Sequence, residues 1–195
     1  FIFMVNNSDA LGGNIGKSLL TELPEIQPAD WVVLELSSFQ LEDLDVLESS
    51  PDVGVVTNFS PNHLDRHKTL DAYRKSKQTL LRWQTPSQVA VLNGDDADVV
   101  GWETHGRRFL FGERDSGAEG IFLNSPENRE AVWRANGKEK ILPLREWLQV
   151  PGGHNLQNAL AASAVALSLG VSETGIETGL RGYRALPHRL EYVGE

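Results

Sequence analysis

Apolar and polar positions along the chain follow two periods, one typical of buried strands and one typical of amphipathic helices. Short apolar runs bounded by turn residues occupy residues 31–34, 53–58, 88–93 and 107–112. Such runs are typical of strands that are buried on both faces of a parallel sheet. Helical patterns lie between and after them, over residues 70–83 behind the cap Thr69, over the alanine-rich residues 159–169, and from Ser172 to about Leu180.

The remaining pattern adds an antiparallel element. Residues 121–123 form a short apolar run, and residues 132–141 surround Asn136-Gly137, a dipeptide typical of two-residue hairpins. Strands that alternate with helices, together with a hairpin, predict an α/β fold. We expect a largely parallel, Rossmann-like sheet flanked by helices, with a small antiparallel hairpin or edge region.

Composition narrows the classes of function. The 195 residues are 40% hydrophobic and 23% charged, which is enough for the core of one globular domain. The net charge of −9 argues against a nucleic-acid-binding surface. The sequence has no cysteine, which excludes disulfides, thiol catalysis and cysteine-ligated metals within it. No apolar run approaches the ~20 residues of a membrane-spanning helix, so we expect no membrane partner.

A glycine-rich segment lies near the start of the chain, at residues 11–18. Gly16-Lys17-Ser18 matches the last three positions of a phosphate-binding P-loop. That motif also needs a glycine five residues before Gly16, where Leu11 stands, and no convincing strand leads into the segment. We therefore reject a P-loop. We expect a loop whose glycine backbone lets another group come close, followed by a helix through Leu23.

Chemically active side chains follow two of the predicted strands. Glu35 interrupts the apolar run at residues 31–34, and His63 lies in the polar segment after the next strand. In parallel α/β sheets, ligands collect outside the carboxyl ends of the strands. Glutamate and histidine are ordinary ligands for a divalent cation. The residues alone therefore favour a metal site of low specificity, with a solvated strand-end glutamate as the alternative.

Two further groups leave alternatives open. Lys77 lies on the apolar stripe of the predicted helix at residues 70–83. It is either a stem whose amine reaches solvent, the commoner case, or a desolvated amine with a lowered pKa that is available for chemistry. Asn155 and Asn158 share one face near a helix start, and their residue type alone indicates helix caps.

The sequence contains six further motifs, which follow one another along the chain. They are Gly12-Gly13-Asn14-Ile15-Gly16, Leu34-Glu35-Leu36-Ser37-Ser38-Phe39-Gln40-Leu41, Asn62-His63-Leu64-Asp65-Arg66, Tyr73-Arg74-Lys75-Ser76-Lys77, Gly153-His154-Asn155-Leu156-Gln157-Asn158-Ala159 and Leu186-Pro187-His188-Arg189. These motifs span nearly the whole chain, and in this order they closely resemble the central, ATP-binding domain of the Mur ligase family.

The resemblance implies an ATP-dependent amide ligase of peptidoglycan-precursor synthesis in the cytoplasm. The residues after Glu35 are most similar to those of the family member that adds D-glutamate to UDP-N-acetylmuramoyl-L-alanine. ATP would convert the terminal carboxylate of that acceptor into an acyl phosphate, which the amine of D-glutamate would attack. The implied cofactor is Mg²⁺ or Mn²⁺, with ATP as co-substrate. The full-length protein is expected to be a monomer without nucleic-acid or membrane partners.

The resemblance also implies roles for individual residues. Lys77 matches a lysine that family members carry as a carbamate, an anionic oxygen donor suited to a hard cation. The expected catalytic and metal-binding residues are Glu35, His63 and Lys77. The expected contacts of the muramoyl substrate are Asn14, Ser37 and Gln40. The expected contacts of the nucleotide are Asn155, Asn158 and Arg189.

Where the sequence departs from the family pattern, the expected domain is incomplete. Residues 1–187 match a central domain without the family's P-loop, and residues 188–195 match the start of the connection to a C-terminal domain. We expect this stretch to be inactive by itself. Two alternatives remain: another Mur-type or folylpolyglutamate-type ligase, or a non-catalytic nucleotide-sugar-binding module.

Overall fold

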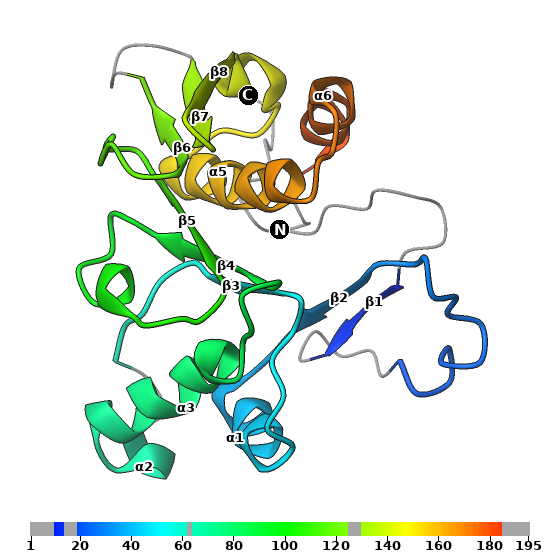
Figure 1. Ribbon diagram of the computed structural model, residues 1–195, viewed down its shortest axis with the longest axis vertical. Helices are drawn as coiled ribbons and strands as arrows, with labels where there is room; N and C mark the ends of the chain where they lie inside the picture. The colour runs from blue at the N-terminus through cyan, green and yellow to red at the C-terminus, as the bar shows by residue number, and fades with distance from the viewer. Residues whose placement is uncertain (1–9, 14–18, 62–63, 125–129, 185–195) are drawn as a thin grey trace, which may run out of the picture.

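The computed structural model describes residues 10–13, 19–61, 64–124 and 130–184, whose strands form two sheets (Figure 1). A small parallel pair consists of β1 (Ala10–Gly13) and β2 (Val32–Glu35). The larger sheet has the order β3-β4-β5-β6-β7-β8. Its strands are β3 (Val53–Val56), β4 (Val89–Asn93), β5 (Arg107–Gly112), β6 (Gly120–Leu123), β7 (Ala131–Ala135) and β8 (Lys138–Leu142).

The predicted fold class is confirmed. Strands β3 to β6 pair in parallel, and β7 and β8 extend the sheet as an antiparallel edge hairpin. The hairpin turns at Asn136 and Gly137, which both have positive φ angles, 53° and 68°. This backbone conformation is the reason why Asn-Gly is favoured in two-residue hairpins.

The central strands alternate their side chains between two apolar clusters, one on each face of the larger sheet. One cluster packs against α5 (Gly153–Ser168) and includes Val91, Phe109, Phe111, Ile121 and Leu123. The other includes Ala90, Leu92, Leu110 and Phe122, together with Leu81 of α3 (Leu70–Arg82). Because successive side chains point to opposite faces, this alternation fixes the register of each strand.

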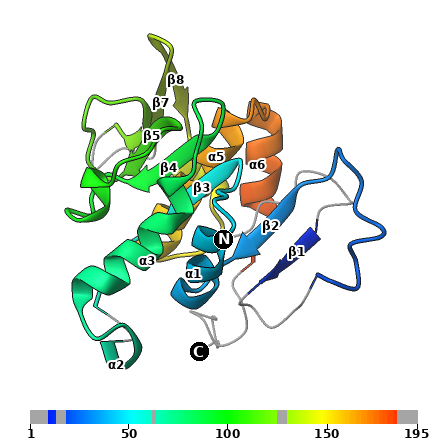
Figure 2. The ribbon, with the colours of Figure 1, turned by 60° about the horizontal axis from the view of Figure 1, so that its bottom comes forward.

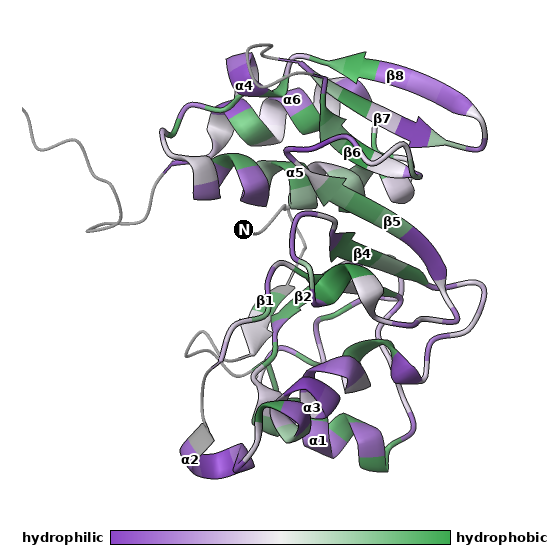
Figure 3. Ribbon diagram, turned by 90° about the vertical axis from the view of Figure 1, so that its left-hand side faces the viewer, coloured by the Kyte–Doolittle hydropathy of each residue, from purple (hydrophilic) through white to green (hydrophobic). Residues whose placement is uncertain are grey.

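The helices form a layer on each side of the larger sheet (Figure 2). Helix α1 (Ser38–Val46) packs against α3, which is preceded by the short α2 (Leu64–His67), and a 3₁₀ turn, η1 (Val99–Gly101), lies beside β4. On the other side, α4 (Leu144–Trp147) and α6 (Glu173–Gly182) pack with α5. Figure 3 shows β4 and β5 as largely hydrophobic ribbons. None of the described helices is both long and apolar enough to span a membrane.

Near the N-terminal end of the described chain, three expectations are wrong. The strand β1 leads into the glycine-rich segment, where no strand was expected. Residues 19–25 form turns rather than a helix, with backbone bonds from Glu22 and Leu23 back to Leu19. Strand β2 is not buried on both faces: Val32 and Leu34 are 41% and 49% exposed, because β2 pairs with β1 and lies outside the larger sheet of the described chain.

The alanine-rich helix also begins earlier than expected, at Gly153 rather than at residue 159. The Pro-Gly-Gly sequence at its start indicates a loop, but Gly153 already belongs to the helix, and Gly152, with φ of 103°, is its N-cap. Asn155 and Asn158 therefore lie within the first turns of α5 and not before it. The remaining predicted strands and helices occur within one or two residues of their expected bounds.

The packing of α5 on the sheet predicts a stability difference between two leucine-sized positions. Leu160 is fully buried in the cluster under α5, whereas Ile141 on the edge strand β8 is 54% exposed. Leu160→Ala removes packed atoms and is expected to lower the free energy of unfolding by about 2–5 kcal/mol. Ile141→Ala should change it by about 0.5 kcal/mol or less. Urea unfolding followed by tryptophan fluorescence measures both, and equal midpoints would contradict the assignment of the core.

Candidate functional site

Glu35 is held at the end of β2 by its backbone. It is in parallel register with Gly13, the last residue of β1. Gly13 has φ of +96°, and a Cβ at this position would lie only 2.3 Å from the carbonyl oxygen of Glu35. Only glycine satisfies both conditions. The expectation that the glycine-rich segment lets another group come close is confirmed at Gly13, and that group is the backbone of Glu35.

Ser37 and Gln40, which were expected to contact substrate, form the capping box of α1. The Ser37 hydroxyl accepts a hydrogen bond from the Gln40 backbone N–H, and the Gln40 side-chain oxygen accepts one from the Ser37 N–H at 2.9 Å. The reciprocal bonds satisfy two donors at the helix start. The Ser-x-x-Gln spacing was the sequence signal for this role. Both side chains are thereby fixed within a few residues of Glu35.

Lys77 lies on α3, and its side chain is partly buried. Burial lowers the pKa of the Lys77 amine, and the Glu35 carboxylate opposes this shift to a smaller extent. The two groups are therefore close enough for their charges to interact, although they are far apart in the sequence. Of the two open alternatives for Lys77, this environment favours the desolvated amine over the stem that reaches solvent.

The side chains of Glu35 and Lys77, as the structure describes them, provide only part of a binding site for a hard cation. Among the described residues, no three His, Asp or Glu side chains come together as a metal site. His63, Asn14 and Arg189 lie outside the described residues. Glu35 offers carboxylate oxygens, and a protonated lysine beside it would repel a cation. Conversion of Lys77 to an oxygen donor would make the pair suitable for Mg²⁺ or Mn²⁺.

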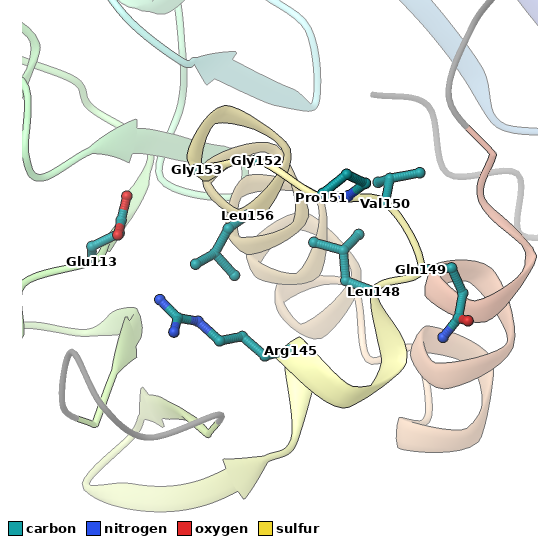
Figure 4. A pocket seen from close by; sticks show the side chains of 9 residues that line it. All are labelled: Glu113, Arg145, Leu148, Gln149, Val150, Pro151, Gly152, Gly153 and Leu156. Carbon is teal, nitrogen blue, oxygen red and sulfur yellow. The ribbon is translucent and has the colours of Figure 1, made fainter. Parts of the chain in front are cut away.

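The predicted nucleotide-binding asparagines lie at the start of α5. Asn155 is buried, and its side-chain amide donates a hydrogen bond of 2.6 Å to the Pro151 carbonyl. The interpretation of the two asparagines as helix caps is wrong, because the N-cap of α5 is Gly152 and no side chain of the described residues caps this helix start. Asn158, one turn further, is partly buried. A pocket of about 630 Å³ opens beside this helix start (Figure 4), and no predicted site residue of the described chain lines it. Its lining consists of Glu113, Arg145, Leu148, Gln149, Val150, Pro151, Gly152, Gly153 and Leu156.

Two side chains at the end of β4 and just after it, Asn93 and Asp96, bind the segment that follows β3. The Asn93 side chain donates to the Thr57 carbonyl at 2.7 Å, and the Asp96 carboxylate accepts from the Phe59 backbone N–H at 2.7 Å. Asn93 is the last residue of β4 and lies at the carboxyl end of a parallel strand, where ligand sites are common. This place in the sequence could have identified Asn93 as a residue that organises the strand ends.

The sequence analysis did not predict the hydrogen bond of 2.9 Å between Ser38 and His67, and no sequence spacing predicts it.

Comparisons with known proteins agree with this architecture. The model of the Mur ligase middle domain matches residues 6–166. A protein of Pelotomaculum thermopropionicum named UDP-N-acetylmuramoylalanine--D-glutamate ligase is 37% identical over 187 residues, covering 95% of this chain and 40% of that protein. The protein of the same name from Desulfitobacterium hafniense is 39% identical over 186 residues, covering 94% and 40%. The chain thus spans about 40% of the length of these relatives.

Solved structures show the same fold at lower identity. A crystal structure of MurF from Acinetobacter baumannii has a TM-score of 0.65 and 22% identity, covering 96% of this chain and 48% of that one. A pseudomurein peptide ligase type C from Methanothermus fervidus has a TM-score of 0.61 and 18% identity, covering 94% and 50%. The structure is a doubly covered α/β domain with a carboxylate and a desolvated lysine near one strand end. The chain belongs to the Mur ligase family.

The contact between Gly13 and Glu35 predicts a difference between two glycines that both have positive φ. At Gly117 (φ +73°) an added Cβ would meet no atom within 4 Å, so Gly117→Ala should cost only the backbone strain of roughly 1–2 kcal/mol. Gly13→Ala adds a clash with the Glu35 carbonyl and should cost more. It should also shift the backbone amide resonances of residues 32–35. Unfolding measurements and NMR spectra test this, and equal costs with unchanged β2 resonances would contradict the close approach.

Proposed function

We propose that the complete protein containing this chain is an ATP-dependent ligase that adds D-glutamate to UDP-N-acetylmuramoyl-L-alanine in the cytoplasm. The observation that carries the proposal is the Glu35 carboxylate beside the desolvated Lys77 amine in a chain of the Mur ligase family. The choice of substrates is supported by the name that relatives of 37% and 39% identity carry. Residues 1–187 would belong to the central domain, residues 188–195 would lead out of it, and the complete protein would act as a monomer.

The proposed reaction has two steps. The terminal carboxylate of the acceptor attacks the γ-phosphorus of ATP, which forms an acyl phosphate and releases ADP. The amine nitrogen of D-glutamate then attacks the acyl carbon, the nitrogen loses a proton, and phosphate leaves from the tetrahedral intermediate. Both steps bring negatively charged oxygens together, on the transferred phosphoryl group in the first step and on the tetrahedral intermediate in the second. A bound Mg²⁺ or Mn²⁺ supplies charge neutralisation at these oxygens.

Glu35, His63 and a carbamylated Lys77 would hold the cation. A carbamate forms when an uncharged amine attacks carbon dioxide and loses a proton, so the lowered pKa of Lys77 favours the reaction. Lys75, two residues earlier and therefore on the solvent side of α3, instead forms an ion pair with Asp71 at 3.0 Å and is 66% exposed. The two lysines of one helix therefore differ in their suitability for carbamylation.

Substrate contacts would come from the ends of two helices. Ser37 and Gln40, fixed by their own capping bonds, would lie beside the muramoyl substrate together with Asn14. Asn155 and Asn158, in the first turns of α5, would contact the nucleotide together with Arg189. Asn155 is already engaged with the Pro151 carbonyl, so its proposed part is to fix the helix start as well as to face the nucleotide.

Activity of the complete protein tests the proposal. Phosphate release from ATP with UDP-N-acetylmuramoyl-L-alanine should require D-glutamate. Lys77→Ala should lower the rate by more than the roughly 10–100-fold typical for loss of a partner behind a metal ligand. A short carboxylic acid should restore part of the activity by replacing the missing oxygen donor. Lys75→Ala is the matched control and should retain the wild-type rate. Release driven by a different amino acid would identify another Mur-type ligase, and a fully active Lys77→Ala protein would make Lys77 a packed stem.

The lowered pKa of Lys77 also predicts the pH dependence of carbamylation. At a fixed concentration of dissolved ¹³C-labelled carbon dioxide, the carbamate signal should rise with pH as the amine loses its proton. Because burial lowers the pKa of Lys77, this rise should occur at a lower pH than for an amine with the ordinary lysine pKa of 10.5 at the same carbon dioxide concentration. ¹³C NMR measures the signal, which should be lost in Lys77→Ala and kept in Lys75→Ala. A rise at the same pH as for an ordinary lysine amine would count against the desolvated amine.

A further inference from the structure

His67 is a buried histidine for which neither the family resemblance nor the proposed reaction gives a role. Its side chain is only 3% exposed. One ring nitrogen, Nε2, lies 2.9 Å from the Ser38 hydroxyl, and the other, Nδ1, lies 3.4 Å from the Glu42 carboxylate. The ring stacks on Phe39, with centroids 5.5 Å apart and planes within 4°, and it contacts the Tyr73 ring at 5.2 Å.

The order serine, histidine, carboxylate is also the order of a nucleophilic triad, but this cluster cannot act as one. A nucleophilic serine must reach substrate, and Ser38 is 2% exposed. The rings of Phe39 and Tyr73 pack against the histidine. The Ser38 hydroxyl and the Nε2 atom of His67 share a hydrogen bond of 2.9 Å, and the Glu42 carboxylate lies 3.4 Å from the Nδ1 atom of the same ring. The cluster is therefore a set of satisfied polar contacts between helices.

The partners of His67 lie on the two helices that frame the candidate site. Ser38 is the first residue of α1, which starts three residues after Glu35. Tyr73 lies one helical turn before Lys77 on α3, so the two side chains share one face. His67 itself ends α2 and contacts both helices. A displacement of His67 would therefore change the distance between the Glu35 and Lys77 elements.

The backbone around His67 couples it directly to the start of α3. Its carbonyl accepts a hydrogen bond of 2.8 Å from the Thr69 N–H, across Lys68, which has a positive φ of 65°. Thr69 is the N-cap of α3, and its hydroxyl accepts from the Ala72 N–H at 3.1 Å. The tight turn leaves little slack, so the position of the imidazole and the position of the helix start are linked.

We propose that His67 is a positioning residue that fixes α1 against α3 and thereby sets the separation of the Glu35 carboxylate and the Lys77 side chain. The inference rests on the proposed ligase function, because it concerns the cation site that Glu35 and Lys77 would form. The imidazole contributes through its hydrogen bond to Ser38, through its stacking on Phe39 of α1 and through its tilted ring contact with Tyr73 of α3. It touches neither substrate nor cation. Groups behind metal ligands typically change affinity or activity roughly 10–100-fold when they are removed.

The test uses the complete protein and separates the hydrogen bond from the ring contacts. His67→Phe keeps an aromatic ring but removes both polar contacts, His67→Gln keeps a group that reaches Ser38, and Ser38→Ala removes the partner. His105, an exposed histidine before β5, provides the matched control His105→Phe. The readouts are Mn²⁺ binding by electron paramagnetic resonance without substrates, the ¹³C carbamate signal of Lys77, and kcat and KM for the D-glutamate-dependent reaction.

His67→Phe and Ser38→Ala should each weaken Mn²⁺ binding and lower kcat about 10–100-fold, and they should reduce the carbamate signal. KM for D-glutamate should stay unchanged. The double variant should be no worse than either single variant, because both remove the same bond. His67→Gln should recover part of the loss, and His105→Phe should match the wild type.

The two proposals fail in different ways. If the wild-type protein shows no D-glutamate-dependent phosphate release, the proposed function is wrong. If the wild type is active and His67→Phe keeps wild-type Mn²⁺ binding, carbamate signal and kcat, the positioning role is wrong. Should His67→Phe fail to fold, Ser38→Ala decides alone, because wild-type Mn²⁺ binding in that variant would overturn the proposal.

Discussion

The burial of the central strands between two helical layers is the constraint on which the rest of the structure depends. Because β4 to β6 alternate their side chains between the α5 face and the α3 face, neither layer can shift without exposing apolar surface. Leu81 anchors α3 in its cluster and is fully buried. Once α3 is fixed in this way, Lys77, one turn earlier, is held in a partly desolvated position. The chemistry proposed for its amine is therefore a consequence of the core packing.

The candidate site depends on backbone contacts as much as on side chains. Glu35 is placed by its parallel pairing with Gly13, and α1 begins directly after it through the capping box of Ser37 and Gln40. At the carboxyl ends of β3 and β4, Asn93 and Asp96 bind the backbone of residues 57–59. Each of these contacts satisfies a backbone donor or acceptor at the carboxyl end of a strand, where the strand ladder itself can no longer do so.

The sequence predicted correctly those strands, helices and turns whose local residue pattern agrees with their burial in the folded chain. The strands from Val53 to Leu123 and the helix after Thr69 have the apolar period of their burial, and the Asn136-Gly137 turn has the residues its dihedral angles require. The local pattern gave wrong predictions where tertiary packing, and not the residues themselves, determines the conformation or the burial. Gly152 and Gly153 resemble a loop, but the packing of α5 extends the helix through Gly153. The apolar residues 32–34 have the pattern of a buried strand, and this pattern does not reveal that β2 pairs only with β1 in the described chain.

For the candidate site, the family resemblance identified residues that periodicity could not rank. Periodicity left two interpretations for Lys77, and its burial and its charge interaction with Glu35 in the folded chain favour the desolvated amine. His67 illustrates the opposite case, because its partners Ser38 and Tyr73 lie on two different helices. No rule of spacing brings these residues together, since their proximity exists only after α1 has packed on α3.

The pairing of Gly13 with Glu35 has a consequence for how the length of this chain can vary. The turns at residues 19–25 connect β1 to β2 at the surface, and such connections tolerate insertions at little cost. A single residue inserted within β2 itself would have the opposite effect, because it would turn Glu35 to the other face of the strand pair. Insertions and deletions in homologous chains should therefore be frequent in the connection and absent from the four residues that end at Glu35.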